Sequence, residues 1–330
     1  IRIDFPHFES YITASFAGNM IDGQWVVKTR ENYAIPFNAI HGKDYRFTPL
    51  RQAPVSDLTG KWQATLGLTE EKPEAAVGEF QQTGNHLTGT FLTETGDYRY
   101  LEGTVQGDNA WLSCFDGSHA FLFEMKIVND STLTGAFYSG KHYQTTWEAK
   151  RNAQAKLADP DSLTFLKPGF EELIFAFENP DGKLISPENP EYQGKVKLVQ
   201  IMGTWCPNCK DETEFLTQYL SEKNDPNLAV ISLAFEKHTD KAKAHQIIST
   251  YKNRLGIPWE VVHAGMNKKD EASKALPALN QVLAFPTLIV LDKNNRVRRI
   301  HTGFSGPATS EYEDFKKGFD AFVSQLLTEG

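Results

Sequence analysis

The sequence is poor in cysteine, in long apolar runs and in positive charge. Three cysteines in 330 residues are too few to hold the chain together as a disulfide scaffold. No apolar run approaches the roughly 20 residues that a membrane-spanning helix needs. The formal net charge of -8 argues against nucleic acid and anionic membrane surfaces as partners. What remains is the composition of an ordinary soluble protein, long enough to bury cores in two or three domains.

Two of the three cysteines are separated by only two residues, in the run WCPNC at residues 205–209. Residues 197–202 before it predict a buried strand, and the residues after it carry apolar side chains at helical spacing. Cys206 is therefore expected at a helix N-terminus, where unpaired N–H groups and the helix dipole favour a thiolate, and Pro207 suits the first helical turn. We interpret the pair as a reversible dithiol, in which Cys206 attacks and Cys209 resolves the mixed disulfide.

Two other roles for this pair stay open from spacing alone. A zinc site would need two further ligands, and the third cysteine, Cys114, lies about ninety residues upstream. A structural disulfide would close so small a loop that it adds little stability. We therefore predict no metal site, and a redox-active Cys206–Cys209 disulfide with no separate cofactor. Cys114 lies in a predicted strand, so a buried thiol is expected there, and a redox contact with Cys206 would need docking of two domains.

Four motifs extend the pattern beyond the cysteines. They are the strand and active-site run at 199–209, Phe285-Pro286-Thr287 before an apolar strand at 288–291, a hairpin at 292–297 leading to His-Thr-Gly-Phe at 301–304, and Glu212 shortly after Cys209. On these motifs, residues 168–330 resemble the thioredoxin fold, and specifically the TlpA/ResA-like branch of extracytoplasmic thiol-disulfide oxidoreductases. The resemblance covers nearly half of the chain.

The resemblance implies roles for the residues around the cysteines. The loop at 285–287 matches the family's cis-proline loop, whose backbone pairs with an extended substrate, and Trp205 and Pro207 border the same substrate site. Glu212 matches an active-site acid, which would exchange protons with the cysteines if burial raises its pKa. The alternatives are an ordinary trans proline that opens a strand, and a solvated glutamate near the start of a helix.

One position departs from the pattern of thioredoxins themselves. They carry a buried aspartate six residues before the first cysteine, whereas this chain has Gln200. Because an amide cannot ionise, proton transfer would fall to Glu212 or to water. Peroxidases of the same fold surround their reactive cysteine with a Pro-x-x-x-Thr-x-x-Cys pattern that this chain lacks, so that class is disfavoured.

The carboxy-terminal half alternates apolar strands with helices, which predicts an α/β domain with a mostly parallel sheet and a final antiparallel hairpin. Besides 197–202 and 288–291, strands are expected near 173–177, 228–234 and 259–262, and helices near 240–255, 273–282 and 310–327. The Asn-Pro-Asp-Gly run at 179–182 predicts a turn between two short strands.

The amino-terminal half has the pattern of an all-β domain. Turn residues recur every nine to thirteen residues between positions 84 and 140, which predicts an antiparallel meander, as a sandwich or, more in keeping with its regularity, a lipocalin-like barrel. The first 55 residues, with turns at 21–24 and 41–44, predict a separate small sheet. We therefore divide the chain into a β-rich domain at 1–160, with the barrel at 56–150 and a linker at 151–160, and a thioredoxin-like domain at 161–330.

The predicted function is reduction of disulfides in envelope proteins, with protein thiols and an upstream electron donor as partners. The resemblance implies the bacterial periplasm or envelope, and a chain that starts at Ile1 is consistent with a processed form. The alternative is a binding or docking protein that acts through its β-domain, with the redox module as an accessory. Aromatic residues would then line a pocket, although more often such residues form a core. They are Trp62, Tyr98, Tyr100, Trp111, Tyr143 and Trp147.

Overall fold

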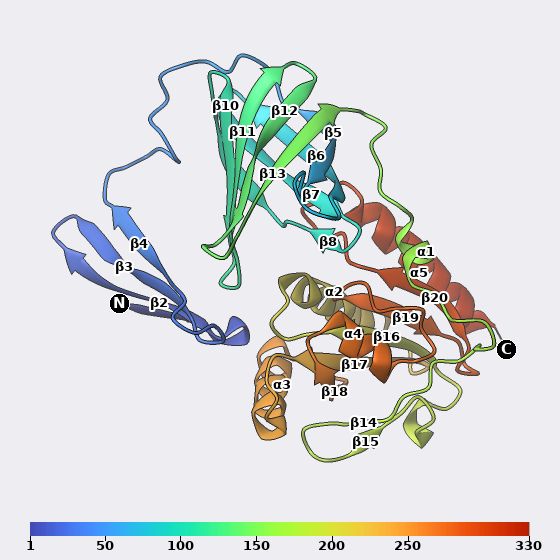
Figure 1. Cartoon of the computed structure of the whole chain (residues 1–330). Helices are drawn as coiled ribbons and strands as arrows, with labels where there is room; N and C mark the ends of the chain where they lie inside the picture. Colours follow the sequence, from blue (N-terminus) through green and yellow to red (C-terminus); the bar gives the residue numbers. More distant parts are fainter. Residues whose placement is uncertain (330) are drawn as a thin grey trace. The chain divides into compact units, whose positions relative to one another are not determined.

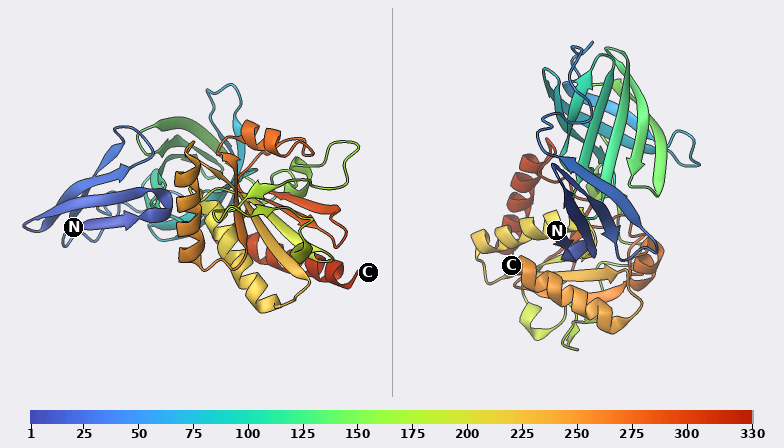
Figure 2. Two further views of the ribbon diagram at one scale, coloured as in Figure 1. Left: turned by 90° about the horizontal axis from the view of Figure 1, so that it is seen from below. Right: turned by 90° about the vertical axis from the view of Figure 1, so that its left-hand side faces the viewer.

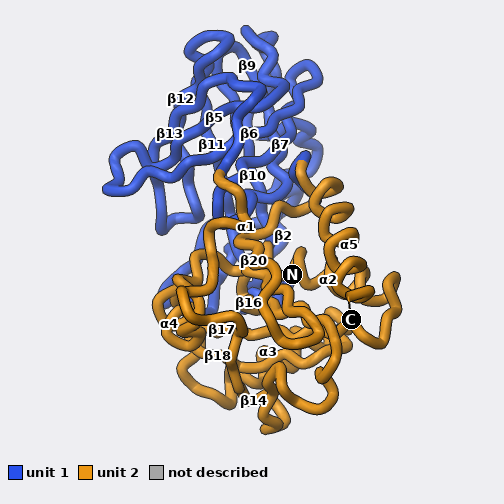
Figure 3. The backbone as a smooth tube through the Cα atoms, turned by 90° about the vertical axis from the view of Figure 1, so that its right-hand side faces the viewer, with its two compact units in different colours: residues 1–157, 307–310 blue, residues 158–306, 311–330 orange. Residues whose placement is uncertain are grey.

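The computed structural model describes residues 1–329, which form two compact units (Figure 3). The first unit comprises residues 1–157 and 307–310, and the second comprises residues 158–306 and the residues from Glu311 onward. The division after Leu157 lies close to the domain boundary that we placed at residue 160. The grouping of residues 307–310 with the first unit has no counterpart in the sequence pattern.

The chain begins with a four-stranded antiparallel sheet in the order β1-β2-β3-β4 (Figure 1). Its strands are β1 (Arg2–Phe5), β2 (Ser10–Ala17), β3 (Met20–Val27) and β4 (Ala34–Ile40), and a short 3-10 helix, η1 (Pro6–Phe8), follows β1. The predicted turn at 21–24 is wrong, because these residues lie inside β3. Gly23 allows close approach of β2 instead of a turn, since a Cβ atom there would lie 2.0 Å from the carbonyl oxygen of Thr13.

The next eight long strands form a closed antiparallel barrel. Each of these strands pairs with the next one in the list, and the last, β13, pairs with the first, β5, which closes the barrel. The two-residue strand β8 (Gly96–Asp97) lies between β7 and β9 in the sequence, and β7 pairs directly with β9. The strands are β5 (Gly60–Leu66), β6 (Glu74–Thr83), β7 (His86–Thr93), β9 (Leu101–Gln106), β10 (Asn109–Phe115), β11 (Ala120–Asn129), β12 (Thr132–Ser139) and β13 (Tyr143–Arg151). This confirms the all-β prediction and selects the barrel over the sandwich.

The interior of the barrel is an aromatic core. Trp62, Phe91, Phe123 and Trp147 are fully buried, and the rings of Phe91 and Phe123 stack with centroids 4.4 Å apart. Of the six aromatic residues considered for a pocket, Trp62 and Trp147 belong to this core, and Tyr98 packs against it. The others do not line a common space with them, since Trp111 stacks on Phe47, and Tyr100 and Tyr143 are exposed. The core interpretation of Trp62 and Trp147 is therefore the correct one.

The second unit is built on a five-stranded sheet in the order β18-β17-β16-β19-β20. The neighbours β16, β17 and β18 are parallel, whereas β19 and β20 are antiparallel additions. This arrangement agrees with the expected thioredoxin-like sheet and its final hairpin. The strands are β16 (Val196–Met202), β17 (Leu228–Glu236), β18 (Glu260–Met266), β19 (Thr287–Leu291) and β20 (Val297–Thr302), and a two-stranded hairpin, β14 (Phe177–Glu178) and β15 (Leu184–Ile185), lies outside this sheet.

Helices cover both faces of this sheet (Figure 2). Alternation along β16 sends Leu198 and Met202 into a core shared with α2, α3 and α5, and Val199 and Ile201 into a core shared with α4. The helices are α2 (Pro207–Lys223), α3 (Lys241–Leu255), α4 (Lys269–Ala275) and α5 (Tyr312–Thr328). Gln200 shares the α2 face of β16, where it meets the first turns of that helix.

Two predicted elements of this unit need correction. The helix expected at 273–282 is α4, which starts earlier and ends at Ala275, because Pro277 restricts Leu276 and cannot continue the helix. The strand expected at 173–177 is not formed over that range. Leu173 and Phe175 are buried, but just before them Glu172 forms only an isolated bridge with Arg296, and continuous pairing begins at Phe177 in β14. Burial with an alternating pattern therefore occurs here without a continuous strand.

The predicted linker is partly ordered by local contacts. Strand β13 ends at Arg151, and the chain then runs to Asp159, whose side chain accepts a hydrogen bond from the Asp161 N–H and caps the short helix α1 (Pro160–Leu163). In the second unit, Asp161 contacts His301 and Arg299 of β20, with His301 Nδ1 and Asp161 Oδ1 2.7 Å apart. The 3-10 helix η2 (Pro190–Tyr192) leads into β16.

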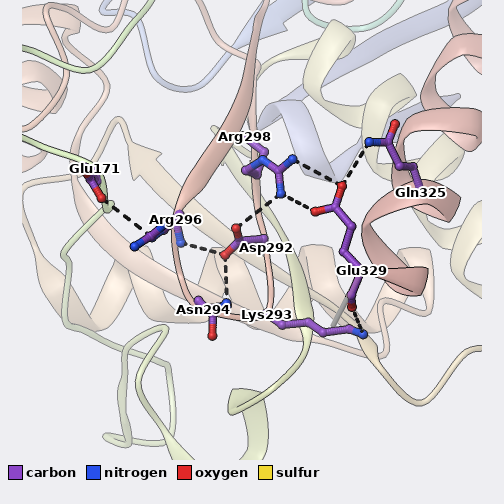
Figure 4. A network of polar contacts seen from close by, with 8 residues as sticks. All are labelled: Glu171, Asp292, Lys293, Asn294, Arg296, Arg298, Gln325 and Glu329. Atoms are coloured by element: carbon purple, nitrogen blue, oxygen red, sulfur yellow. Dashed lines mark hydrogen bonds and ion pairs between the residues drawn. The ribbon is translucent and has the colours of Figure 1, made fainter.

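A polar network joins the turn between β19 and β20 to the end of α5 (Figure 4). Asp292 accepts backbone hydrogen bonds from Asn294 and Arg296, at 2.9 and 3.0 Å. Arg298 lies 3.4 Å from the other Asp292 oxygen and also pairs with Glu329. The turn is at the end of β19 remote from Pro286, so this network stabilises the fold away from the cysteines.

Candidate active site

The cysteine pair lies where the central strand gives way to α2. β16 ends at Met202, residues 203–205 turn the chain, and Cys206 is the N-cap of α2 with extended backbone angles. The Cys206 sulfur accepts a hydrogen bond from the Cys209 N–H at 3.2 Å, so it satisfies one of the helix's unpaired donors. Both side chains are free thiols in this structure, and Cys206 keeps 6% exposure whereas Cys209 has none. Only Cys206 is accessible to another molecule.

The buried thiol has a strongly perturbed acidity. Burial raises the pKa of Cys209 well above its ordinary value, because a thiolate loses its hydration there. The hydrogen bond to Cys206, and the charges of Cys206 and Glu212, raise the pKa further. Cys209 therefore stays protonated until a nearby group accepts its proton.

The loop before β19 lies against the Cys206 sulfur. The Phe285–Pro286 peptide bond is cis, and the Cys206 thiol donates to the Phe285 carbonyl oxygen at 3.3 Å. The Pro286 carbonyl is already bonded to the Gly303 N–H at 2.9 Å, and the Thr287 hydroxyl donates to the Ala284 carbonyl. In this loop, the Phe285 carbonyl is therefore the group that lies against the Cys206 sulfur.

Trp205 lies beside the same loop and is half-buried. Its indole N–H donates to the Phe235 carbonyl at 2.8 Å, and its ring meets the Phe285 ring edge to face with centroids 5.7 Å apart. The Lys237 ammonium lies 5.4 Å from the centre of the indole, within cation–π range. Pro207 is buried in the first turn of α2. These residues form one wall beside Cys206.

Glu212 is fully buried on α2, so the alternative of a solvated glutamate is wrong. Burial raises its pKa to about 8, and a hydrogen bond from Gln200 opposes part of that rise. The Gln200 amide N–H donates to Glu212 Oε2 at 3.0 Å, and Glu212 Oε1 has no partner among the described residues. A carboxyl group with this pKa is mostly protonated at pH 7 and ionised in a minor fraction, so it can give up or accept a proton near that pH.

Gln200 joins Glu212 to a buried polar network. Its amide nitrogen lies 3.1 Å from the Thr213 hydroxyl, which donates to the Cys209 carbonyl, and its amide oxygen accepts from Ser232 at 2.9 Å. The network continues to Tyr251, which donates to Thr213, and to Trp259, whose indole N–H donates to Ser232. A residue that cannot ionise thus occupies the position of the thioredoxin aspartate, and it is held by hydrogen bonds on both ends of its amide.

Sequence reasoning missed several of these residues. Ser232 is a polar residue inside an apolar strand, and Thr213 follows Cys209 by one helical turn, which are signals that could have indicated them. Their contact with Gln200 depends on the parallel register that pairs Gln200 with Ser232. Thr204 and Glu236, which contact each other beside the cysteines, were missed too.

The third cysteine belongs to the barrel unit. Cys114 is partly buried in β10, and burial raises its pKa to about 11. Over residues 1–329, the structure contains no cluster of three or more histidine, cysteine or carboxylate side chains that could hold a metal ion. The same stretch contains no helix long and apolar enough to cross a membrane.

Residues 175–315 match the model of the Redoxin family. The carboxy-terminal domain is therefore similar to the Redoxin family, and we refer to it as the Redoxin domain. Its relatives include the thiol:disulfide interchange protein DsbE of Escherichia coli, which is 26% identical over 175 residues, or 51% of this chain and 81% of that protein. The thiol-disulfide oxidoreductase ResA of Geobacillus thermodenitrificans is 23% identical over 133 residues, or 40% of this chain and 65% of ResA.

Two solved structures align with the carboxy-terminal half of the chain. A thiol:disulfide interchange protein from Chlorobium tepidum aligns with a TM-score of 0.36 and 21% identity, over 48% of this chain and 95% of that one. A thiol-disulfide isomerase from Corynebacterium glutamicum aligns with a TM-score of 0.38 and 17% identity, over 49% and 99%. The family match and the curated relatives confirm a TlpA/ResA-like thiol-disulfide oxidoreductase with an amino-terminal β-rich extension.

Proposed function

We propose that this oxidoreductase reduces disulfides of other proteins in the bacterial envelope through the Cys206–Cys209 dithiol. One observation carries the proposal. The Cys206 sulfur caps α2, lies beside the Phe285 carbonyl and is slightly exposed, whereas Cys209 is fully buried. This asymmetry suits one attacking and one resolving thiol.

The first step forms a mixed disulfide. The Cys206 thiolate attacks one sulfur of the substrate disulfide, so that a Cys206–substrate S–S bond forms, the substrate S–S bond breaks, and the second substrate sulfur leaves as a thiolate. The Cys209 N–H, which already donates to the Cys206 sulfur, stabilises negative charge there. The leaving thiolate takes up the proton that Cys206 released.

The second step resolves the mixed disulfide. Cys209 attacks the Cys206 sulfur, which forms the Cys206–Cys209 disulfide and releases the substrate as a dithiol. Because the pKa of Cys209 is raised, it must lose its proton as it attacks. Ionised Glu212, whose pKa is about 8, can accept that proton and pass it to the departing substrate sulfur. Overall the substrate gains two electrons and two protons, and the enzyme loses them.

The substrate would lie against the loop at 285–287. The Phe285 backbone faces Cys206, Trp205 and Pro207 border the sulfur on the α2 side, and Pro286 and Thr287 hold the loop through their bonds to Gly303 and Ala284. An extended substrate segment could then pair with the Phe285 backbone in the manner of an added strand. Pro286 and Thr287 act on the shape of this surface, whereas Phe285 and Trp205 contact the substrate.

No separate cofactor enters this cycle, because the disulfide itself stores the two electrons. An upstream protein dithiol must reduce Cys206–Cys209 again after each turnover. We place the cycle outside the cytoplasm on the resemblance to the TlpA/ResA-like branch. The aromatic core of the barrel offers no observation in favour of a ligand-binding function for the β-rich domain.

A redox titration of the purified chain in thiol buffers tests the proposal. Free thiols counted by mass should report one reversible two-electron couple that involves Cys206 and Cys209 and leaves Cys114 unchanged. A low reduction potential would support a reductase, whereas a high potential would assign an oxidant. The absence of a reversible couple would overturn the proposal. Cys209→Ser should in addition trap substrates on Cys206 as mixed disulfides.

A further inference from the structure

The buried carboxylate of Glu236 forms hydrogen bonds with the turn that precedes Cys206. Glu236, at the carboxyl end of β17, is 1% exposed. Its Oε1 accepts a hydrogen bond from the Thr204 backbone N–H at 2.9 Å, and its Oε2 accepts one from the Thr204 hydroxyl at 2.8 Å. Both oxygens of one side chain therefore hold a residue that lies two positions before the attacking cysteine.

A β-bulge in β18 lies opposite the end of β17 that contacts this turn. Ala234 pairs with His263, but Phe235 pairs with Gly265, so Ala264 is an extra residue on β18. Gly265 has a φ of +144°, a conformation that suits glycine. Beyond the bulge, the Phe235 carbonyl accepts from the Trp205 indole and the Glu236 side chain reaches Thr204. Two successive residues of β17 thus fix two successive residues of the active-site turn.

The turn has little room to adopt another position. A Cβ atom on Gly203 would lie 2.3 Å from the Trp205 indole nitrogen and 3.0 Å from the Phe235 carbonyl oxygen. The indole therefore packs directly over the backbone of the turn. Cys206 in turn donates its thiol to Phe285, so a shift of the turn would move the sulfur relative to the loop at 285–287.

We infer that Glu236 is a positioning residue of the active site, which holds Thr204 so that the Cys206 sulfur stays aligned with the substrate loop. The inference rests on the proposed disulfide exchange and adds a residue to it. Glu236 acts through its two bonds to Thr204. A buried carboxylate costs stability unless its oxygens are hydrogen-bonded, and here the bonds to Thr204 satisfy both of them.

A positioning role for Glu236 can be distinguished from a purely structural role by the exchange rate of the folded protein. A residue that only stabilises the fold changes the unfolding midpoint and leaves the exchange rate of the folded enzyme unchanged. A positioning residue changes the rate constant with which the reduced, folded enzyme attacks a disulfide. Leucine is the sharpest replacement for Glu236, because it has a similar volume but no atom that can form a hydrogen bond with Thr204, whereas the amide of glutamine could still donate to the Thr204 hydroxyl.

The experiment measures the second-order rate constant for reduction of glutathione disulfide by the full chain, and its equilibrium constant with glutathione. Glu236→Leu should lower the rate constant about tenfold or more, because both bonds to Thr204 are lost. Thr204→Val removes the hydroxyl bond from the other side, whereas Thr204→Ser retains it and should behave as the parent. The double variant of Glu236→Leu and Thr204→Val should be no slower than Glu236→Leu alone, since both act through one contact.

Asp292→Leu is the matched control. Asp292 is also a buried carboxylate that accepts two backbone hydrogen bonds, but it holds the turn at the far end of β19. It should lower the unfolding midpoint and leave the exchange rate unchanged. If Glu236→Leu behaves like Asp292→Leu, or if the two single effects simply multiply in the double variant, the inference is wrong. Failure of the parent chain to exchange at all would instead overturn the proposed function.

Discussion

The two units bury comparable interiors with different kinds of side chain. The barrel centres on large aromatic residues such as Trp62 and Trp147, packed ring against ring. The region behind Cys209 is just as inaccessible, but it contains Gln200, Glu212 and Thr213, all at 0% exposure. Polar burial is costly unless it is compensated by hydrogen bonds, whereas aromatic burial is favourable by itself.

This difference indicates what each interior does. The barrel core is organised for stability, and its members can be exchanged only at the cost of packing. The polar interior is organised around the two thiols, and its least satisfied atom, Glu212 Oε1, belongs to the group best suited to move a proton. Changes in the barrel should therefore alter stability alone, and changes behind the cysteines should alter chemistry and pH dependence.

The largest effect is expected at the attacking thiol. Cys206→Ser should lower the rate of disulfide reduction at least about a thousandfold, because a hydroxyl is far less nucleophilic than a thiolate. The measurement is the rate of glutathione disulfide reduction, with Cys114→Ser as the control that should leave the rate unchanged. Residual activity within tenfold of the parent would remove Cys206 from the mechanism.

A barrel substitution of large energetic effect tests the other side of the comparison. Trp147→Ala should destabilise the barrel by about 3–5 kcal/mol, because it empties the centre of a packed aromatic core. Denaturant unfolding followed by circular dichroism would report the loss. The exchange rate of the folded chain should stay at the parent value. A change in that rate would show that the barrel core contributes to the chemistry.

The pH dependence of stability tests the polar interior. The raised pKa of Glu212 means that the unfolded chain ionises this group between pH 4.5 and 8 while the folded chain keeps the proton. The contribution of Glu212 to the free energy of unfolding therefore falls as pH rises through that window. Glu212→Gln removes this loss, so the variant should match the parent near pH 4 and exceed its free energy of unfolding by about 3 kcal/mol at pH 7.

Glu212→Asp is a useful control for that comparison, because it keeps an ionisable group in the same site. It should retain a pH-dependent stability, whereas Glu212→Gln should lose it. A parent chain whose stability does not decline relative to Glu212→Gln between pH 4.5 and 8 would mean that the pKa of Glu212 is not raised in the folded state. Proton exchange between Glu212 and Cys209 near pH 7 would then have to be abandoned.

Local patterns in the sequence were enough for the features that depend on neighbours along the chain. The spacing of Cys206 and Cys209, the strand before them and the helix after them follow from such patterns, as does the meander of the barrel. Contacts between distant residues could not be predicted in this way. The bond between Thr204 and Glu236 needs the register of β16 against β17 and a bulge in β18, and neither leaves a local signal.

Gly23 is a second case in which contacts between distant residues could not be predicted from the sequence. Gly23 looked like a turn residue because glycine is common in turns, yet in the sheet it allows two strands to approach closely. Only the strand pairing distinguishes the two uses.

The smallest effect is expected at a buried cation on the other face of β16. Lys197 has no exposure, its ammonium donates to the carbonyls of Tyr192 and Lys195, and burial lowers its pKa to about 8, which the charge of Asp292 partly opposes. Between pH 8 and 10.5 the unfolded chain still holds a proton that the folded chain has lost, so stability from this group rises with pH in that window and is lowest below it. Lys197→Met should remove the rise. At pH 7 the variant should differ from the parent by only about 1 kcal/mol, because the loss of the two hydrogen bonds from the ammonium offsets the relief of the buried charge, and the Tyr192 carbonyl keeps its bond from the Lys195 N–H. Unfolding free energies at pH 7 and pH 10 measure both effects, and a parent chain without a rise between these values would show that Lys197 keeps its charge in the folded protein.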